Sequence, residues 1–267
     1  MQPIDYRRQT VLITGASSGI GAEFARRLAA RGSDVVLVAR RRDRLEKLAG
    51  QLSERHGVTA TATAMDLAVP RAGADLDREL ADRGIEVTSL VNNAGFATYG
   101  PFHEEDPDRL AAEIALDITG VVDLSRTFIG RLRERGDGFL VNLASMAAYQ
   151  AAPALAVYGA AKAFVLTFTE ALWYESRGTG LRVLALSPGA TQTEFFEVAG
   201  EGADGGMSRT TPETVVRTAL KTLDRRNPPP SVIVGRLNRI ASSTTTLLSR
   251  RHATMVLGSM MSPEKGR

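Results

Sequence analysis

The sequence predicts an α/β protein built on a doubly wound, seven-stranded parallel sheet with helices on both faces. Short runs rich in β-branched residues alternate with longer amphipathic stretches, which is the pattern of successive βα units. The short runs are apolar along almost their whole length, as strands buried on both faces require. With 267 residues, 43% of them hydrophobic, the chain can bury a substantial core of this class.

The elements are expected in regular order along the chain. Strands are predicted over residues 10–15, 34–40, 59–66, 89–92, 138–143, 181–187 and 231–234, and helices over 19–31, 42–56, 72–83, 107–135, 154–177 and 212–225. A run of three prolines at 228–230 ends the last of these helices before the final strand. Residues 1–235 are therefore predicted to form one domain, and residues 236–267 a helical tail. Within the domain, the segment 191–211 is too long for a simple connection and is interpreted as a lid or a disordered loop.

Composition excludes several classes of function. The 33 basic and 30 acidic residues nearly balance, which argues against a dedicated nucleic-acid binder. Cysteine is absent, so disulfides and thiolate chemistry are excluded, and a reducing cytoplasm is the expected compartment. The three histidines stand far apart in the sequence, so no metal site is expected. No apolar run reaches about 18 residues, and the first ten residues are polar, so neither a membrane span nor a signal peptide is expected.

A glycine-rich turn follows the first predicted strand and opens the first predicted helix. Its glycines allow the backbone to turn sharply and approach a pyrophosphate, and the helix N-terminus presents free N–H groups to that anion. The spacing is G-x-x-x-G-x-G rather than the common G-x-G-x-x-G, and an ordinary turn is the alternative interpretation. The candidate cofactor-binding residues here are Gly15, Ser17, Ser18, Gly19, Ile20 and Gly21.

The end of the second strand favours NADP(H) over NAD(H). An NAD site usually places a carboxylate here, about 20 residues beyond the glycines. This chain has Arg40 and Arg41 instead, and a guanidinium pairs well with a 2′-phosphate. A solvated basic start to the next helix is the alternative. Asp66, followed by Leu67 after the third strand, is placed to accept a hydrogen bond from an adenine amino group, or else to cap a helix.

Tyr158 and Lys162 lie four residues apart, so on a helix they share one face. An ammonium beside a phenol favours the phenolate and is expected to lower the pKa of Tyr158 from about 10 toward working pH. Ser145, further upstream, can hold a carbonyl oxygen in line with that phenol. Together the three groups could protonate a carbonyl, or deprotonate an alcohol, beside a hydride carrier. The alternative is a lysine that merely extends over a core tyrosine.

In this combination the motifs resemble the short-chain dehydrogenases/reductases in their single-domain form. The resemblance covers about residues 10–234 and rests on the glycine turn, Asn92-Asn93-Ala94-Gly95, Ser145, the Tyr158-Gly159-Ala160-Ala161-Lys162 segment and Pro188-Gly189. It implies a seven-stranded Rossmann sheet that binds a nicotinamide dinucleotide, in a homodimer or homotetramer.

The resemblance also implies a role for each matching residue. Tyr158 would be the general acid/base, Lys162 would lower its pKa and hold the nicotinamide ribose, and Ser145 would orient the substrate oxygen. Thr193 would bind the carboxamide. The remaining cofactor contacts implied at the strand ends are Asn92, Asn93, Ala94, Gly95, Pro188, Gly189 and Thr191.

One position departs from the family pattern. Many members carry an asparagine in the middle helix, before a Thr-Gly or Thr-Ala step, and it helps hold a water that connects the lysine to solvent. Here Asp117 stands in that place, before Thr119-Gly120, and is included among the catalytic candidates. A carboxylate can still bind that water and, when charged, raises the pKa of the lysine.

The substrate pocket is expected to be apolar. By position its lining is residues 96–102, 146–149, Ala154, Leu155, Phe195, Phe196 and Val198. This composition favours a neutral, apolar ketone, aldehyde or secondary alcohol, unless these residues simply pack against one another. Glycines at 200, 202, 205 and 206 would let the lid move.

The tail carries an imperfect apolar stripe, comprising Leu237, Ile240, Thr244, Leu247, Leu248, Met255 and Leu257, with flanking arginines. Docking on its own domain or on a partner subunit is favoured over contact with an anionic membrane surface. The leading functional hypothesis is an NADP(H)-dependent carbonyl reductase or alcohol dehydrogenase. The alternatives are a non-catalytic dinucleotide sensor and a membrane-surface or scaffolding protein on the same fold.

Overall fold

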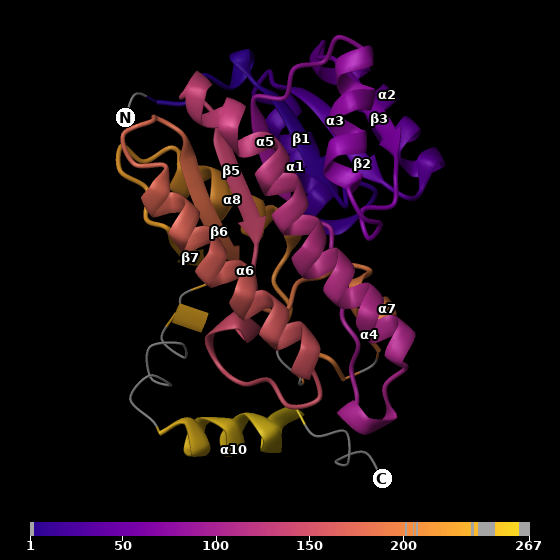
Figure 1. Cartoon of the computed structure of the whole chain (residues 1–267), viewed down its shortest axis with the longest axis vertical. Coiled ribbons are helices and arrows are strands. Elements are labelled where there is room, and N and C mark those ends of the chain that lie inside the picture. Colours follow the sequence, from indigo (N-terminus) through magenta and orange to yellow (C-terminus); the bar gives the residue numbers. More distant parts are fainter. Residues whose placement is uncertain are drawn as a thin grey trace.

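The computed structural model contains one seven-stranded, all-parallel sheet in the order β3-β2-β1-β4-β5-β6-β7 (Figure 1). It describes residues 3–200, 202–204, 206, 208–235, 238–239 and 249–261. The strands are β1 (Thr10–Thr14), β2 (Asp34–Ala39), β3 (Ala60–Ala64), β4 (Ser89–Asn92), β5 (Phe139–Leu143), β6 (Arg182–Ser187) and β7 (Ser231–Ile233). The predicted fold class and all seven predicted strands are confirmed.

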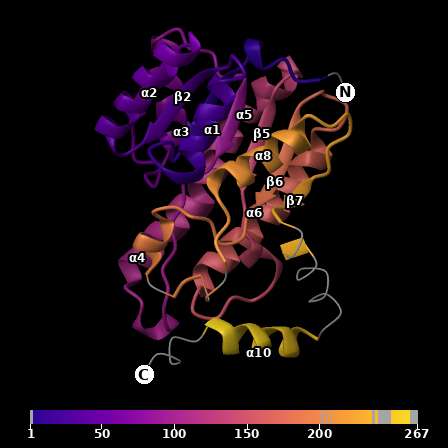
Figure 2. The ribbon, with the colours of Figure 1, turned by 180° about the vertical axis from the view of Figure 1, so that it is seen from behind.

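Helices cover both faces of the sheet, as Figures 1 and 2 show from opposite sides. Along β1 the side chains alternate: Val11 and Ile13 enter one core cluster, and Leu12 enters the other. The first cluster joins the sheet to α1 (Gly19–Ala29), α2 (Arg42–His56) and α8 (Pro212–Leu223), and the second joins it to α3 (Ala72–Asp82), α5 (Val121–Arg135) and α6 (Ala156–Glu175). This two-sided burial explains the nearly continuous apolar character of the strands.

The strand order reverses between β1 and β4. β1 continues through β2 to β3 on one side, whereas β4 begins the run to β7 on the other. In open α/β sheets, ligands bind outside the carboxyl ends of the strands at such a switch point. The topology therefore directs attention to the loops that follow β1, β4, β5 and β6.

The helix predicted over 107–135 is interrupted at its centre. α4 (Pro107–Ile114) is followed by a π-helical segment, η3 (Ala115–Gly120), before α5 begins. Single π-helical turns inside α-helices frequently mark functional sites. Here the inserted turn contains Asp117.

The segment 191–211, called the lid below after its predicted role, is partly structured. α7 (Phe195–Ala199) lies within it, and an isolated parallel bridge joins Thr191 to Thr210. Short 3₁₀ turns complete the list of elements: η1 (Tyr6–Arg8), η2 (Phe102–Glu104) and η4 (Met146–Tyr149).

Most of the predicted tail stripe, including Leu237, Ile240, Thr244, Leu247 and Leu248, lies outside the described residues. The described part is α10 (Arg250–Met261). Within the part of the chain that the structure describes, no helix has both the length and the apolar character that a membrane span needs.

Candidate active site

Ser145, Tyr158 and Lys162 meet near the carboxyl ends of β4, β5 and β6. Ser145 lies two residues beyond β5 and accepts a hydrogen bond from the Ala147 N–H at 3.1 Å, which begins η4. Tyr158 and Lys162 lie in the first two turns of α6, and the lysine Nζ is 5.5 Å from the centre of the Tyr158 ring. The four-residue spacing thus places both side chains on one helix face, as expected.

The Ser145 hydroxyl lies beside the Tyr158 hydroxyl and acts to lower its pKa. The Tyr158 ring is partly exposed and packs against Phe195 from the lid, with ring centroids 5.4 Å apart. Burial raises the pKa of Tyr158, and the opposing effects of the Lys162 ammonium and the Ser145 hydroxyl do not overcome it. The expected net lowering of this pKa is therefore wrong for the protein without cofactor, because desolvation of the phenolate outweighs its attraction to the lysine.

Lys162 is buried, with 5% of its surface exposed, and its ammonium has two polar neighbours. Nζ lies 2.8 Å from Oδ2 of Asp117 and donates to the Leu143 carbonyl at 3.2 Å. Burial alone would lower the pKa of Lys162, but the Asp117 carboxylate and Tyr158 oppose it, and the pKa is raised. The lysine therefore remains an ammonium at neutral pH.

Asp117 is completely buried in the π-helical turn and is bound on two sides. Oδ2 pairs with Lys162, and Oδ1 accepts the Phe96 N–H at 3.1 Å. A side chain at Gly95 would place its Cβ 2.9 Å from both carboxylate oxygens, so the glycine permits the loop after β4 to approach Asp117. Burial raises the pKa of Asp117 while Lys162 lowers it. The carboxylate thus contacts the lysine directly.

The glycine turn after β1 has the shape that a pyrophosphate requires. Gly15 and Gly19 adopt positive φ angles of 65° and 54°, and a Cβ on Gly21 would collide with the Gly15 carbonyl. Ser18 is the N-cap of α1, yet its side chain makes no capping hydrogen bond. The N–H groups in the first turn of α1 are therefore not occupied by the Ser18 side chain and can bind an anion at the turn. Ile20 packs on the core behind them.

The two arginines at the end of β2 differ in their surroundings. Arg41 bonds the hydroxyls of Ser17 and Ser18 at 2.9 Å and pairs with Glu194 of the lid at 2.7 Å. Arg40 is exposed, and among the described residues no hydrogen bond or ion pair engages its side chain. Both could face a 2′-phosphate, but only Arg40 is available without breaking an ion pair.

The loops after β3 and β4 border the same edge. Asp66 is exposed and accepts from the Ala68 N–H at 3.0 Å, so it caps a turn rather than a helix, while Leu67 belongs to the core. The Asn93 side chain donates to the Thr14 carbonyl at 2.9 Å, and the Thr14 hydroxyl accepts from the N–H groups of Asn93 and Ala94. The strand ends of β1 and β4 are therefore tied together beside the glycine turn.

Asn92 does not line this edge. Its side chain is buried at 2% exposure, and its amide donates to Ser125 at 3.1 Å and to Asn142 at 2.9 Å. The expectation that Asn92 borders the cofactor is corrected: β4 turns this side chain into the second core cluster, where it links β4 to β5 and α5. Gly95, three residues on, remains at the edge.

The residues after β6 complete the border of the site. Pro188 is buried, and its carbonyl accepts from the Met146 N–H at 2.9 Å. A Cβ on Gly189 would stand 2.6 Å from the Asn238 amide nitrogen. Thr191 bonds the Gly189 carbonyl, and the Thr193 hydroxyl contacts the Thr191 carbonyl at 3.4 Å. A Cβ on Gly19 would lie 2.8 Å from the Thr193 methyl, so the start of the lid crosses the glycine turn.

The expected substrate side is a small apolar cluster around Tyr158. Its members are Ala97, Tyr99, Ala147, Ala152, Leu155, Tyr158, Phe195, Phe196, Ala199, Ala203 and Leu257. Phe102 and Val198 are corrected: they are 63% and 51% exposed and point to solvent rather than into this cluster. Leu257 comes from α10, so the tail helix docks on its own domain, as favoured. Met255 and Val256 on the same helix are exposed.

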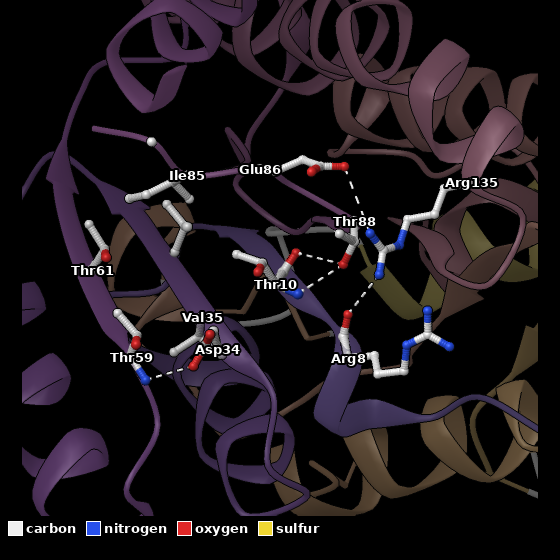
Figure 3. Close-up of a pocket in the computed structure, with 12 residues that line it drawn as sticks. Arg8, Thr10, Asp34, Val35, Thr59, Thr61, Ile85, Glu86, Thr88 and Arg135 are labelled. Carbon is white, nitrogen blue, oxygen red and sulfur yellow. Dashed lines mark hydrogen bonds and ion pairs between the residues drawn. The ribbon is translucent and has the colours of Figure 1, made fainter. Parts of the chain in front are cut away.

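A surface cavity lies at the opposite edge of the sheet and does not belong to this site. It is lined at the amino ends of β1, β2 and β3 by residues that include Arg8, Asp34 and Thr88 (Figure 3). Several of its polar groups are paired with one another, for example Thr59 N–H with Asp34 at 2.7 Å and Arg135 with the Arg8 carbonyl at 3.1 Å. The chemically equipped edge is the carboxyl one.

Sequence reasoning missed two acidic residues near the site. Glu113 is completely buried four residues before Asp117, and Glu194 of the lid pairs with both Arg41 and Arg44. The first carried a signal, because two acids at i and i+4 repel on an ordinary exposed helix. The second had none, since only the fold brings residue 194 to residue 41.

Comparison with known proteins identifies relatives over most of the chain. The family model described as short chain dehydrogenase matches residues 9–204. Sulfoacetaldehyde reductase 2 from Chromohalobacter salexigens is 40% identical over 188 residues, which are 69% of this chain and 73% of that protein. Two solved structures are also similar. A short-chain dehydrogenase from Sphingobium yanoikuyae in complex with NADPH has TM-score 0.79 and 34% identity, covering 93% of this chain and 95% of that one. L-sorbose reductase from Gluconobacter frateurii, complexed with NADPH and L-sorbose, has TM-score 0.74 and 27% identity, covering 85% and 94%.

Proposed function

The chain belongs to the short-chain dehydrogenase family, and from that premise we propose that it is an NADP(H)-dependent oxidoreductase that interconverts an apolar ketone or aldehyde and its alcohol. The observation that carries the proposal is the cluster of Ser145, Tyr158 and Lys162, in which a phenol lies beside a hydroxyl and a buried ammonium. Such a cluster can move a proton to or from a substrate oxygen.

In the reduction direction the proposed roles are as follows. The Ser145 hydroxyl orients the carbonyl oxygen, and the Tyr158 hydroxyl gives that oxygen its proton. The phenolate that remains is stabilised by the Lys162 ammonium, which Asp117 keeps charged at 2.8 Å. A bound nicotinamide dinucleotide supplies the hydride to the carbon. The oxidation direction reverses each transfer, with Tyr158 as the base.

The residues present fit a nicotinamide dinucleotide. The positive-φ glycines and the α1 N-terminus, free of a side-chain cap, suit a pyrophosphate. Gly15, Ser17, Ser18, Gly19, Ile20 and Gly21 are proposed to hold it, with Asn93, Ala94, Gly95, Pro188, Gly189, Thr191 and Thr193 along its nicotinamide half, and Asp66 and Leu67 at the adenine. The exposed Arg40 supports NADP(H), with Arg41 as a second ligand of the 2′-phosphate.

The apolar cluster around Tyr158 supports a neutral substrate. Arg209 stacks on Phe196 at 4.2 Å, but its charge is paired with Asp204 at 2.7 Å. An anionic substrate would have to compete with Asp204 for this guanidinium. The related reductase from C. salexigens is named for sulfoacetaldehyde, so an anionic aldehyde belongs in the substrate screen as a contrasting arm.

We also propose a homo-oligomer. α6 exposes Phe164 and Tyr174, at 41% and 66% of their surface, and Phe164 stacks on Phe168 at 5.7 Å. Exposed aromatic side chains on one helix suit contact with a second copy of the chain. Light scattering on the eluting protein measures the mass, and a monomer at micromolar concentration would contradict this part of the proposal.

The test is NADPH consumption with a panel of apolar ketones and aldehydes, sulfoacetaldehyde, and the corresponding alcohols with NADP⁺. Tyr158→Phe is expected to lower kcat by roughly 10²–10⁴-fold while NADPH affinity stays unchanged. Tyr174→Phe, an exposed tyrosine of the same helix, is the control and should retain full activity. Turnover that survives Tyr158→Phe would contradict the proposal. NADPH binding without turnover of any substrate would favour the dinucleotide-sensor alternative.

A further inference from the structure

Two carboxyl side chains are buried together beside one lysine. Glu113 lies in the last turn of α4, and Asp117 follows four residues later in η3; neither has any exposed surface. The spacing places both on the side of the helix that packs against α6, which carries Lys162. Burial of a charge is costly unless the charge is paired, so the charge on these three groups has to be accounted for.

The two carboxyls have different partners. Asp117 holds the lysine directly, with 2.8 Å between Oδ2 and Nζ. Glu113 instead accepts both of its hydrogen bonds at Oε2, from the Thr98 N–H at 2.9 Å and the Thr98 hydroxyl at 2.8 Å. Its other oxygen, Oε1, is buried and has no hydrogen-bond partner among the described residues. An ionised carboxylate with one bare buried oxygen is strongly disfavoured, whereas a neutral carboxyl is tolerated there.

The electrostatics favour one shared proton on this pair, because burial raises the pKa of both carboxyls. The titratable groups that act on Glu113 are Asp117 from η3 and Lys162 from α6, and Tyr158 on α6 is in turn affected by Glu113. Burial raises the pKa of Glu113; the Thr98 hydrogen bonds oppose this, and Asp117 adds to it. Two carboxylates beside one ammonium would leave a net negative charge in the interior, and one added proton removes it.

We propose that Glu113 and Asp117 carry a single negative charge between them opposite Lys162, with the proton on Glu113. Glu113 then serves as a reserve counter-ion, and it is a positioning residue for the lysine. The inference rests on the proposed function only in giving Lys162 a catalytic task. When Asp117 cannot ionise, Glu113 releases its proton to solvent and supplies the charge in its place.

The first test needs neither substrate nor cofactor. Since the fold raises the pKa of Glu113, its contribution to stability is complete below its unfolded pKa of about 4.3 and is lost as the pH rises through the folded value. Glu113→Gln cannot ionise, so its melting temperature relative to the wild type should rise as the pH is increased from 4 to 9. Glu134→Gln, at an exposed acid of α5, is the control and should show no such trend.

The second test uses kcat. Glu113→Gln should change kcat by less than about threefold, because Asp117 still pairs with the lysine. Asp117→Asn should lower kcat, because it removes the direct partner of the lysine at 2.8 Å and leaves only Glu113 as counter-ion. The double variant leaves Lys162 buried without a carboxylate, and its kcat should fall at least about tenfold below the product of the single effects. If the effects of the two substitutions on kcat were simply multiplicative in the double variant, a charge shared between Glu113 and Asp117 would be contradicted.

Infrared spectroscopy of the wild type with isotope-labelled glutamate gives a readout that requires no substitution. A neutral Glu113 predicts a carbonyl stretch of a protonated carboxylic acid at neutral pH that shifts with the label. A spectrum with carboxylate bands only, or a melting-temperature difference that does not vary with pH, would overturn the proposal. Neither result depends on whether the enzyme reduces carbonyls. A failure of the shared-charge proposal can therefore be distinguished from a failure of the proposed function.

Discussion

Nη1 of Arg41 lies 2.7 Å from Oε2 of Glu194, which joins the end of β2 to the residue that begins the lid helix α7. Arg44 holds the other carboxylate oxygen at 2.6 Å. The hydrogen bonds from these two arginines lower the pKa of Glu194, so the lid carboxylate is charged at neutral pH. A 2′-phosphate that binds Arg41 therefore has to compete with Glu194.

Glu194→Gln should strengthen NADPH binding and leave NADH binding unchanged. The substitution removes the negative charge that occupies Arg41, and partly exposed ion pairs contribute about 0.2–1 kcal/mol, so an affinity gain of about 1.5- to 5-fold is expected. Fluorescence titration of the nicotinamide measures both constants. Glu197→Gln, an exposed acid on the same helix, is the control. Weaker NADPH binding in the Glu194 variant would mean that the ion pair closes the lid over the cofactor instead.

Arg40→Ala should weaken NADPH binding about tenfold or more and hardly affect NADH. Charge-assisted hydrogen bonds contribute about 1.5–3 kcal/mol, and this exposed guanidinium has no ion pair to give up among the described residues. Arg42→Ala is the matched control, since Arg42 is the next basic residue and faces Glu46 at 3.7 Å. Equal losses for both nucleotides would contradict a 2′-phosphate contact.

The free protein should contain no tyrosinate near neutral pH. Burial raises the pKa of Tyr158. The neutral phenol therefore contributes stability that is complete below its unfolded pKa of about 10 and is lost as the pH rises through the folded pKa. Ultraviolet difference titration of wild type against Tyr158→Phe should show no ionisation of this residue between pH 6 and 9. Lys162→Met should shift its ionisation still higher, because the ammonium lowers this pKa. A tyrosinate signal at pH 7 would contradict the prediction.

Asn92→Ala should destabilise the protein without weakening NADPH binding. The side chain donates to Ser125 and Asn142 inside the core, and loss of these buried bonds costs about 1–3 kcal/mol. Chemical unfolding measures the stability and fluorescence titration the affinity. If the affinity fell tenfold while stability held, Asn92 would have the cofactor-facing role that its place in the motif first suggested.

The fold could be predicted from sequence because most strand runs are apolar on both faces and most helices are amphipathic. The order of the elements can therefore be recognised without any tertiary contact. The Tyr158–Lys162 pair was equally accessible, since four residues on one helix fix which side chains meet. Its electrostatics were not. The pKa of Tyr158 depends on its burial in a cluster assembled from distant segments, which includes Phe195, 37 residues away in sequence. Asn92 was misassigned because strand alternation, invisible within a four-residue motif, decides which face it takes.

The tail offers a last prediction about the substrate side. Leu257 of α10 packs on the apolar cluster that contains Tyr158, and Gly258 approaches Pro153 closely enough that a Cβ would lie 3.5 Å from its ring. A helix in that position bounds the space beside the proposed acid.

Leu257→Ala should therefore raise the KM for apolar substrates by several-fold while NADPH affinity stays the same. Truncation of a well-buried leucine removes about 2 kcal/mol or more of packing free energy, and the loss is smaller at this half-buried position. Met255→Ala is the control, because that side chain is 70% exposed on the same helix. Vesicle flotation of both variants separates docking from membrane contact. If Met255→Ala abolished binding to anionic vesicles while Leu257→Ala left KM unchanged, the exposed face of α10 would be the functional one, and the tail would serve a surface outside the protein.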